Sequence, residues 1–178
     1  LLQLNENSNI RTVNQSTDIA GRISVFADLI LLTNNSAIVS GSFSEGKAGE
    51  LKINSSEIEV DKSIIASTTF GKGNAGDINL TAKKLKLSNS GPNDLDIESG
   101  IESGTFAKGD SGNVFINVDE ILINKGFISA KTGGEGKAGN ILLKTNSLIL
   151  TNSAGIVSNT LAKGDSGIVS ISTDILEI

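Results

Sequence analysis

The sequence predicts an all-β fold, a parallel β-helix of about six coils with about 27 residues in each, running through residues 1–178 as one domain. The first observation is a glycine that recurs at intervals of 28, 27, 36, 27 and 28 residues. The second is that aliphatic residues alternate at fixed distances after each glycine. A unit of this length cannot bury its apolar face alone, so it must stack on its neighbours. The glycines that start the predicted coils are Gly21, Gly49, Gly76, Gly112, Gly139 and Gly167.

The first two strands of each coil follow from the spacing of the aliphatic residues. Positions 2, 4, 9 and 11 after each repeat glycine hold Ile, Leu or Val in all 24 cases. Side chains two residues apart lie on the same face of a strand, so each pair of positions predicts a short strand whose apolar face is buried. In the first of these coils the pairs are Ile23 with Val25 and Ile30 with Leu32.

A third short strand is predicted before the next repeat glycine. It starts with an isoleucine in every coil, and the positions two and four residues later hold Ser, Thr or Ala. These small residues lie an even number of positions after the isoleucines, so they are expected to face inward as well. The isoleucines are Ile38, Ile65, Ile101, Ile128 and Ile156.

A glycine-rich turn closes each coil, because glycine tolerates the positive φ that tight turns need. Coils stacked at about 4.8 Å would align the charges of these turns in columns. One column alternates in sign through Lys108, Glu135 and Lys163, and opposite charges on neighbouring strands support register. The turn charges are therefore predicted to support register, with a polar ligand-binding strip as the alternative. The turns are 44–49, 71–76, 107–112, 134–139 and 162–167.

The unit that starts at Gly76 carries an insertion loop, predicted over residues 91–99. It contains Asp94, Asp96 and Glu98, and three carboxylates at alternate positions suit a hard cation such as Ca²⁺. The same segment also fits a strand with a polar outer face, so no metal site is predicted from it.

Composition excludes several classes of function. The chain has no Cys and no His, which removes thiol chemistry, disulfides and the commonest general base. Its net charge is −5 and its basic residues are scattered, so a nucleic-acid partner is not expected. Leu2, Leu4 and Ile10 fit the repeat in the register of Ile30, Leu32 and Ile38, and we expect this chain to be a segment of a longer protein.

Outward positions of the predicted strands are mostly polar, with one exception. Phe115 and Leu142 are expected to be neighbours at position 3 of their coils, and Leu122 and Ile149 at position 10. An exposed apolar patch marks a partner site in many proteins, so these four residues are the predicted partner-binding surface. Cover by a neighbouring loop is the alternative explanation.

Enzymes such as pectate lyases and polygalacturonases also use parallel β-helices, with clustered acidic residues in a long cleft. The acidic residues of this chain are dispersed, so no catalytic residue, cofactor or enzymatic activity is predicted. A polysaccharide-acting or polysaccharide-binding β-helix module remains as the alternative function.

Two segments, 65–80 and 137–143, resemble the repeats of filamentous-haemagglutinin-like exoproteins of the cyanobacterial type, in the runs Ile-Ala-Ser-Thr-Thr-Phe-Gly-Lys-Gly-Asn-Ala-Gly-Asp-Ile-Asn-Leu and Lys-Ala-Gly-Asn-Ile-Leu-Leu. The resemblance extends over nearly the whole chain and implies a right-handed helix. It implies two-partner secretion, in which an outer-membrane transporter recognises a region that this chain does not contain.

The same resemblance implies a structural and adhesive role, secreted or at the outer surface of a Gram-negative bacterium. A host-cell, matrix or polysaccharide ligand would fit that role. The family offers no catalytic residue to transfer to this sequence.

Overall fold

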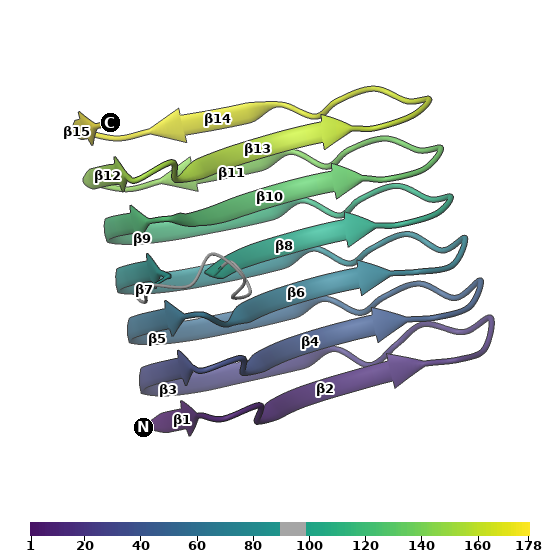
Figure 1. The fold of residues 1–178 in the computed structure, drawn as a ribbon, viewed down its shortest axis with the longest axis horizontal. Coiled ribbons are helices and arrows are strands. Elements are labelled where there is room, and N and C mark those ends of the chain that lie inside the picture. The colour runs from purple at the N-terminus through teal and green to yellow at the C-terminus, as the bar shows by residue number, and fades with distance from the viewer. Residues whose placement is uncertain (90–98) are drawn as a thin grey trace.

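A computed structural model, which describes residues 1–89 and 99–178, confirms the predicted parallel β-helix. Every regular element in the described ranges is a β-strand, and the strands form about six turns of a right-handed solenoid. The coils lie one above another, with the two chain ends at opposite ends of the stack (Figure 1). Each coil pairs in parallel with the coil before it and the coil after it.

Two parallel sheets make up the solenoid. The nine-stranded sheet has the order β1-β3-β5-β7-β9-β11-β14, with β12 paired to β9 and to β15, and the six-stranded sheet has the order β13-β10-β8-β6-β4-β2. The first sheet contains β1 (Leu2–Leu4), β3 (Ile23–Thr33), β5 (Leu51–Asp61), β7 (Ile78–Ser88), β9 (Val114–Asn124), β11 (Ile141–Lys144), β12 (Ser147–Thr151), β14 (Val169–Ser172) and β15 (Ile175–Glu177). The second contains β2 (Asn9–Asn14), β4 (Ala37–Ser42), β6 (Ile64–Thr69), β8 (Ser99–Thr105), β10 (Gly126–Thr132) and β13 (Gly155–Thr160).

The aliphatic columns fill the space between the two sheets. Ile30 pairs with Ile58 in the next coil, and Ile58 pairs with Leu85, so each column runs parallel to the axis of the stack. These three side chains are almost fully buried. In the last coil Val169, Ile171 and Leu176 occupy equivalent positions but are exposed, because no further coil covers them.

The first two predicted strands of a coil are continuous in β3, β5, β7 and β9, each 11 residues long. Pairing skips position 7 after the repeat glycine: Ala27 pairs with Ser55 and Leu29 pairs with Glu57, with no pair between them. Two successive residues face outward there, which shifts the parity and turns the strand. The long strands therefore pass along one face of the solenoid and bend round one narrow side of it, on the left in Figure 1.

The small hydroxyl residues of the six-stranded sheet face inward, as predicted, and bind the repeat glycines. The Ser67 hydroxyl accepts a hydrogen bond from the Gly76 N–H (2.9 Å) and donates to the Gly49 carbonyl (2.9 Å). Ser40, Ser103 and Ser158 make equivalent bonds to the glycines of their own and the preceding coil. These hydroxyls satisfy buried backbone groups at the closing turn, where no strand partner does so.

The corner between the two sheets explains why some intervals are 27 residues and others 28. In one 27-residue coil a single residue at this corner, Lys62, has a positive φ (49°). In a 28-residue coil two residues at the same corner, Asn34 and Asn35, have positive φ (54° and 64°). Lys125 and the pair Asn152–Ser153 repeat this difference. The additional residue therefore lies in a left-handed turn outside the strand register.

The long interval between repeat glycines arises at the same corner, between β7 and β8. Residues 91–98 of the predicted insertion, including Asp94, Asp96 and Glu98, lie outside the described residues. Ser99 was assigned to the insertion, but it begins β8 and is buried, with its hydroxyl bonded to the Ser88 carbonyl.

Candidate ligand-binding surfaces

The four residues of the predicted partner-binding patch form two adjacent pairs. Phe115 on β9 pairs with Leu142 on β11, and Leu122 on β9 pairs with Ile149 on β12. Leu142 is 43% exposed and Leu122 is 36% exposed. The strand bend lies between the two pairs, so they form two small apolar areas and not one continuous surface. Leu122 and Ile149 border a hollow of about 420 Å³.

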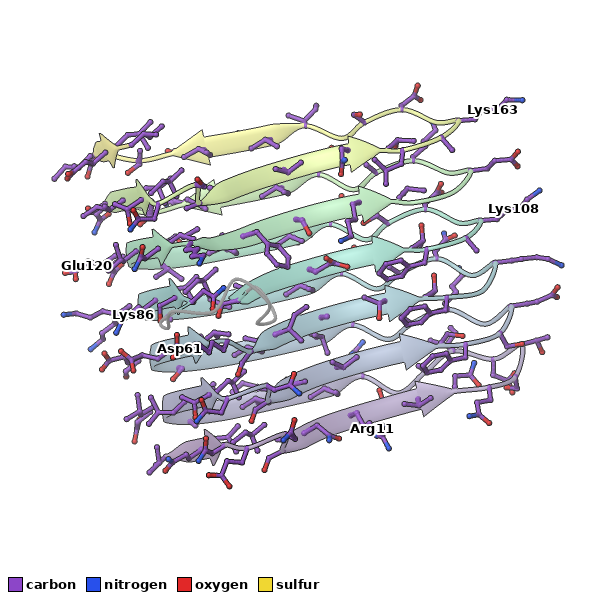
Figure 2. All side chains as sticks on the ribbon, viewed as in Figure 1. Arg11, Asp61, Lys86, Lys108, Glu120 and Lys163 are labelled. Carbon is purple, nitrogen blue, oxygen red and sulfur yellow. The ribbon has the colours of Figure 1, made fainter. Side chains whose placement is uncertain are left out.

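Charged side chains surround that hollow and pair from coil to coil. Lys84 lies 3.5 Å from a Glu120 carboxylate oxygen, and Lys86 lies 3.0 Å from one of Glu59. Figure 2 shows Lys86 and Glu120 at the narrow side of the solenoid where the long strands bend. These exposed pairs contribute only about 0–1 kcal/mol each.

The closing turns, along the opposite narrow side of the solenoid, carry the predicted charge columns. Lys108 pairs with Glu135 (3.1 Å) and Lys137 with Asp165 (3.4 Å), and Figure 2 shows Lys108 and Lys163 projecting there. The Lys72 ammonium bonds the Glu45 carboxylate; this hydrogen bond and the opposite charges lower the pKa of Glu45 and raise the pKa of Lys72. The predicted columns therefore contain real coil-to-coil ion pairs.

None of the six phenylalanines lies in the core. Phe43, Phe70 and Phe106 follow the strands of the six-stranded sheet and stack face to face, with centroid separations of 4.9 and 4.7 Å. The Lys131 ammonium lies 5.6 Å from the Phe106 ring centre and forms an ion pair with the buried Glu102 (2.8 Å). Phe70 is thus stacked on both faces, and Phe106 lies between a ring and a cation, so these contacts between coils support register.

The bend of the long strands forms a hollow of about 680 Å³, which we call the bend groove. Its floor consists of the small residues Ala27, Ser55 and Ala82. Two columns of side chains form its walls, one at position 5 and one at position 7 of successive coils. The walls are Phe26, Asn54, Thr81 and Asn117 on one side, and Asp28, Ser56, Lys83 and Asp119 on the other.

Sequence reasoning missed the bend groove, although it carried a signal for it. Positions 4 and 9 both face inward, yet they are five residues apart. Side chains of a regular strand face the same side only at even separations, so a continuous strand must be interrupted between these two positions. The interruption went unnoticed because positions 2 and 4 and positions 9 and 11 were assigned to two separate strands.

The described residues include no group of three or more His, Cys, Asp or Glu side chains arranged to hold a metal ion. No helix in the described ranges is long and apolar enough to cross a membrane. No protein-family model, curated protein or solved structure matches this chain.

Proposed function

We propose that this chain is a structural and adhesive repeat segment of a large filamentous-haemagglutinin-like protein, secreted or displayed on the outer surface of a Gram-negative bacterium. The observation that supports this function is the unbroken coil-to-coil register. Paired strands and paired closing turns continue through the whole stack, from β1 and β2 to β13 and β14. A stack in which every coil contacts only its neighbours forms a stiff rod that can hold a binding surface away from a cell.

Export by two-partner secretion is consistent with the same architecture. Each coil completes its core with the preceding coil, so a chain that emerges from a transporter can fold one coil at a time. The outer-membrane transporter would recognise a region outside this chain.

Antibodies raised against residues 1–178 test the proposal in the organism that produces the protein. Intact cells or their culture medium should give a signal, and disruption of the transporter gene should abolish it. A signal that appears only after the cells are permeabilised would contradict surface display and secretion.

We further propose that Phe115 and Leu142 contact a protein partner or a second copy of the chain. The double substitution Phe115→Ser and Leu142→Ser should weaken adhesion to host cells or matrix, or self-association in sedimentation, because it removes apolar contact area. The exposed pair Val157→Ser and Leu161→Ser, on and just after β13, provides a control with similar loss of apolar surface. Equal effects of the two double substitutions would reject a specific role for the patch.

A polysaccharide-binding module is the second candidate function, and the bend groove is the observation that favours it. The groove crosses four coils, and its wall side chains come from the same two positions in each. Solenoids commonly bind extended ligands on such repeated surfaces.

A further inference from the structure

The walls of the bend groove are polar, and their side chains are left unpaired by the described part of the fold. Within residues 1–89 and 99–178, none of the seven polar wall side chains bonds to another protein group. Some side chains of the columns on either side do pair: the Lys84 ammonium lies 3.5 Å from a Glu120 carboxylate oxygen in the next coil, and the Asn79 amide donates to Glu50 (2.9 Å). Donors and acceptors of both walls therefore remain available to a ligand in the groove.

The chemistry of the walls matches sugar hydroxyl groups. The Asn54 and Asn117 amides and the hydroxyls of Thr81 and Ser56 each donate and accept hydrogen bonds, as a sugar hydroxyl does. Asp28 and Asp119 add acceptors. Phe26, which is 67% exposed at one end of the groove, offers a ring whose negative face attracts the weakly positive C–H groups of a sugar.

The shape of the groove favours a chain over a single sugar. Its walls repeat once per coil, so they extend over about 14 Å at the spacing between strands. The floor is made of small side chains, and the groove is open at its surface, so an extended polymer can lie along the solenoid axis without entering a closed pocket.

The charges in the groove favour an uncharged ligand. Lys83 is the only cation among the lining residues, and it shares its wall with the two carboxylates of Asp28 and Asp119. Recognition of sulfate or carboxylate groups usually depends on clustered Arg or Lys side chains, which the groove does not offer.

We propose that the bend groove binds an uncharged polysaccharide that lies along the axis of the solenoid, with Asn54, Thr81 and Asn117 as the hydrogen-bonding column and Phe26 as the stacking residue. This inference rests on the proposed adhesive function and names the ligand class of one of its surfaces.

Affinity electrophoresis tests the inference with the chain 1–178. Native gels would contain dextran, laminarin or galactomannan as neutral polymers, and alginate, polygalacturonate or heparin as anionic ones. At least one neutral polymer should retard the chain. The triple substitution Asn54→Ala, Thr81→Ala and Asn117→Ala should raise the dissociation constant at least about tenfold, and Phe26→Ala should raise it by a similar factor.

Matched controls separate binding from folding. Asn159→Ala, on the six-stranded sheet, removes an amide from a different surface and should leave binding unchanged. Circular dichroism melts of all variants should coincide, because surface substitutions without protein partners usually change stability by less than about 0.5 kcal/mol.

The inference is overturned if no neutral polymer retards the chain, if anionic polymers bind as well as neutral ones, or if the triple variant binds like the parent. Antibody labelling of intact cells is independent of these gels. Surface labelling with no binding to neutral polymers would reject the bend-groove inference and leave the surface function in place, whereas absence of labelling would reject the surface function itself.

Discussion

The repeat glycines are required mainly because the backbone of the neighbouring coil lies so close. A Cβ atom placed on Gly139 would overlap the carbonyl oxygen of Gly112, and one on Gly76 would overlap that of Gly49. Positive φ, expected for glycine in these turns, occurs instead at the interior turn residues Gly109, Gly136 and Gly164. The expectation was thus right for part of the turn and wrong for the repeat column, where steric contact is the reason.

The substitution Gly139→Ala should therefore destabilise the protein strongly, by more than about 3 kcal/mol in the free energy of unfolding, because backbone must move in two coils. Gly155→Ala is the matched control, since its Cβ would meet only a Val157 methyl at 3.7 Å. Urea unfolding followed by circular dichroism measures both. Similar midpoints for the two variants would show that close backbone approach does not restrict the repeat glycine.

Ala130 occupies the position at which Ser40, Ser67, Ser103 and Ser158 bind the repeat glycines. Ser67→Ala should lower the free energy of unfolding by about 1–3 kcal/mol, because it leaves the Gly76 N–H and the Gly49 carbonyl without that partner. Ala130→Ser should raise it by about 0.5–1.5 kcal/mol by adding the equivalent bonds. Thermal melts measure both changes, with Ser24→Ala on the exposed face of β3 as the control. A destabilised Ala130→Ser variant would contradict the role assigned to the hydroxyl column.

At the scale of the strands, the sequence was sufficient to predict which side chains face inward. The aliphatic columns and the hydroxyl columns have a period of two, and burial on one face accounts for it. The sequence did not reveal that the two halves of β3 or β5 are one strand, because strand continuity depends on backbone pairing across the bend. Nor did it predict the stack of Phe43, Phe70 and Phe106, since outward aromatic residues lack the burial that creates a readable pattern.

The charge columns of the closing turns lead to a prediction at this scale. Glu135→Lys would remove the ion pair with Lys108 and place like charges in four successive coils, at positions 72, 108, 135 and 163. The melting temperature should fall slightly at low ionic strength and recover at about 1 M salt, where the screening length is about 3 Å. A melting temperature that does not change at low salt would show that the column has no role in register.

The pair of Glu45 and Lys72 adds a dependence on pH. The pKa of Glu45 is lower in the folded chain than in the unfolded chain, so its contribution is present above the unfolded pKa and lost as pH falls through the folded pKa. Because the pKa of Lys72 is raised, its contribution is lost at the alkaline end, as pH rises through the folded pKa. The variant Glu45→Gln should therefore lose less stability on acidification than the parent, as measured by the free energy of unfolding at a series of acidic pH values. An equal loss in the two proteins would disprove the linkage.

At the scale of the whole molecule, stability should vary along the stack. Side chains of β5 and β7 are enclosed by coils on both sides, whereas those of β14 and β15 are exposed throughout. Hydrogen exchange measured by mass spectrometry should therefore be slowest in β5, β7 and β9 and fastest in β14 and β15. Uniform protection along the chain would instead indicate a single cooperative unit.

The left-handed corner between the sheets lets coils differ in length without changing the register of their strands. One residue at Lys62, or two at Asn34–Asn35, gives the same pairing in the strands that follow. The coils whose corner residues the structure describes thus share a vertex at which coil length changes by one residue while the strand register is kept. This vertex is where a fluorescent label, an epitope or a foreign peptide can be grafted with least disturbance, and one copy could be presented at each level of the rod.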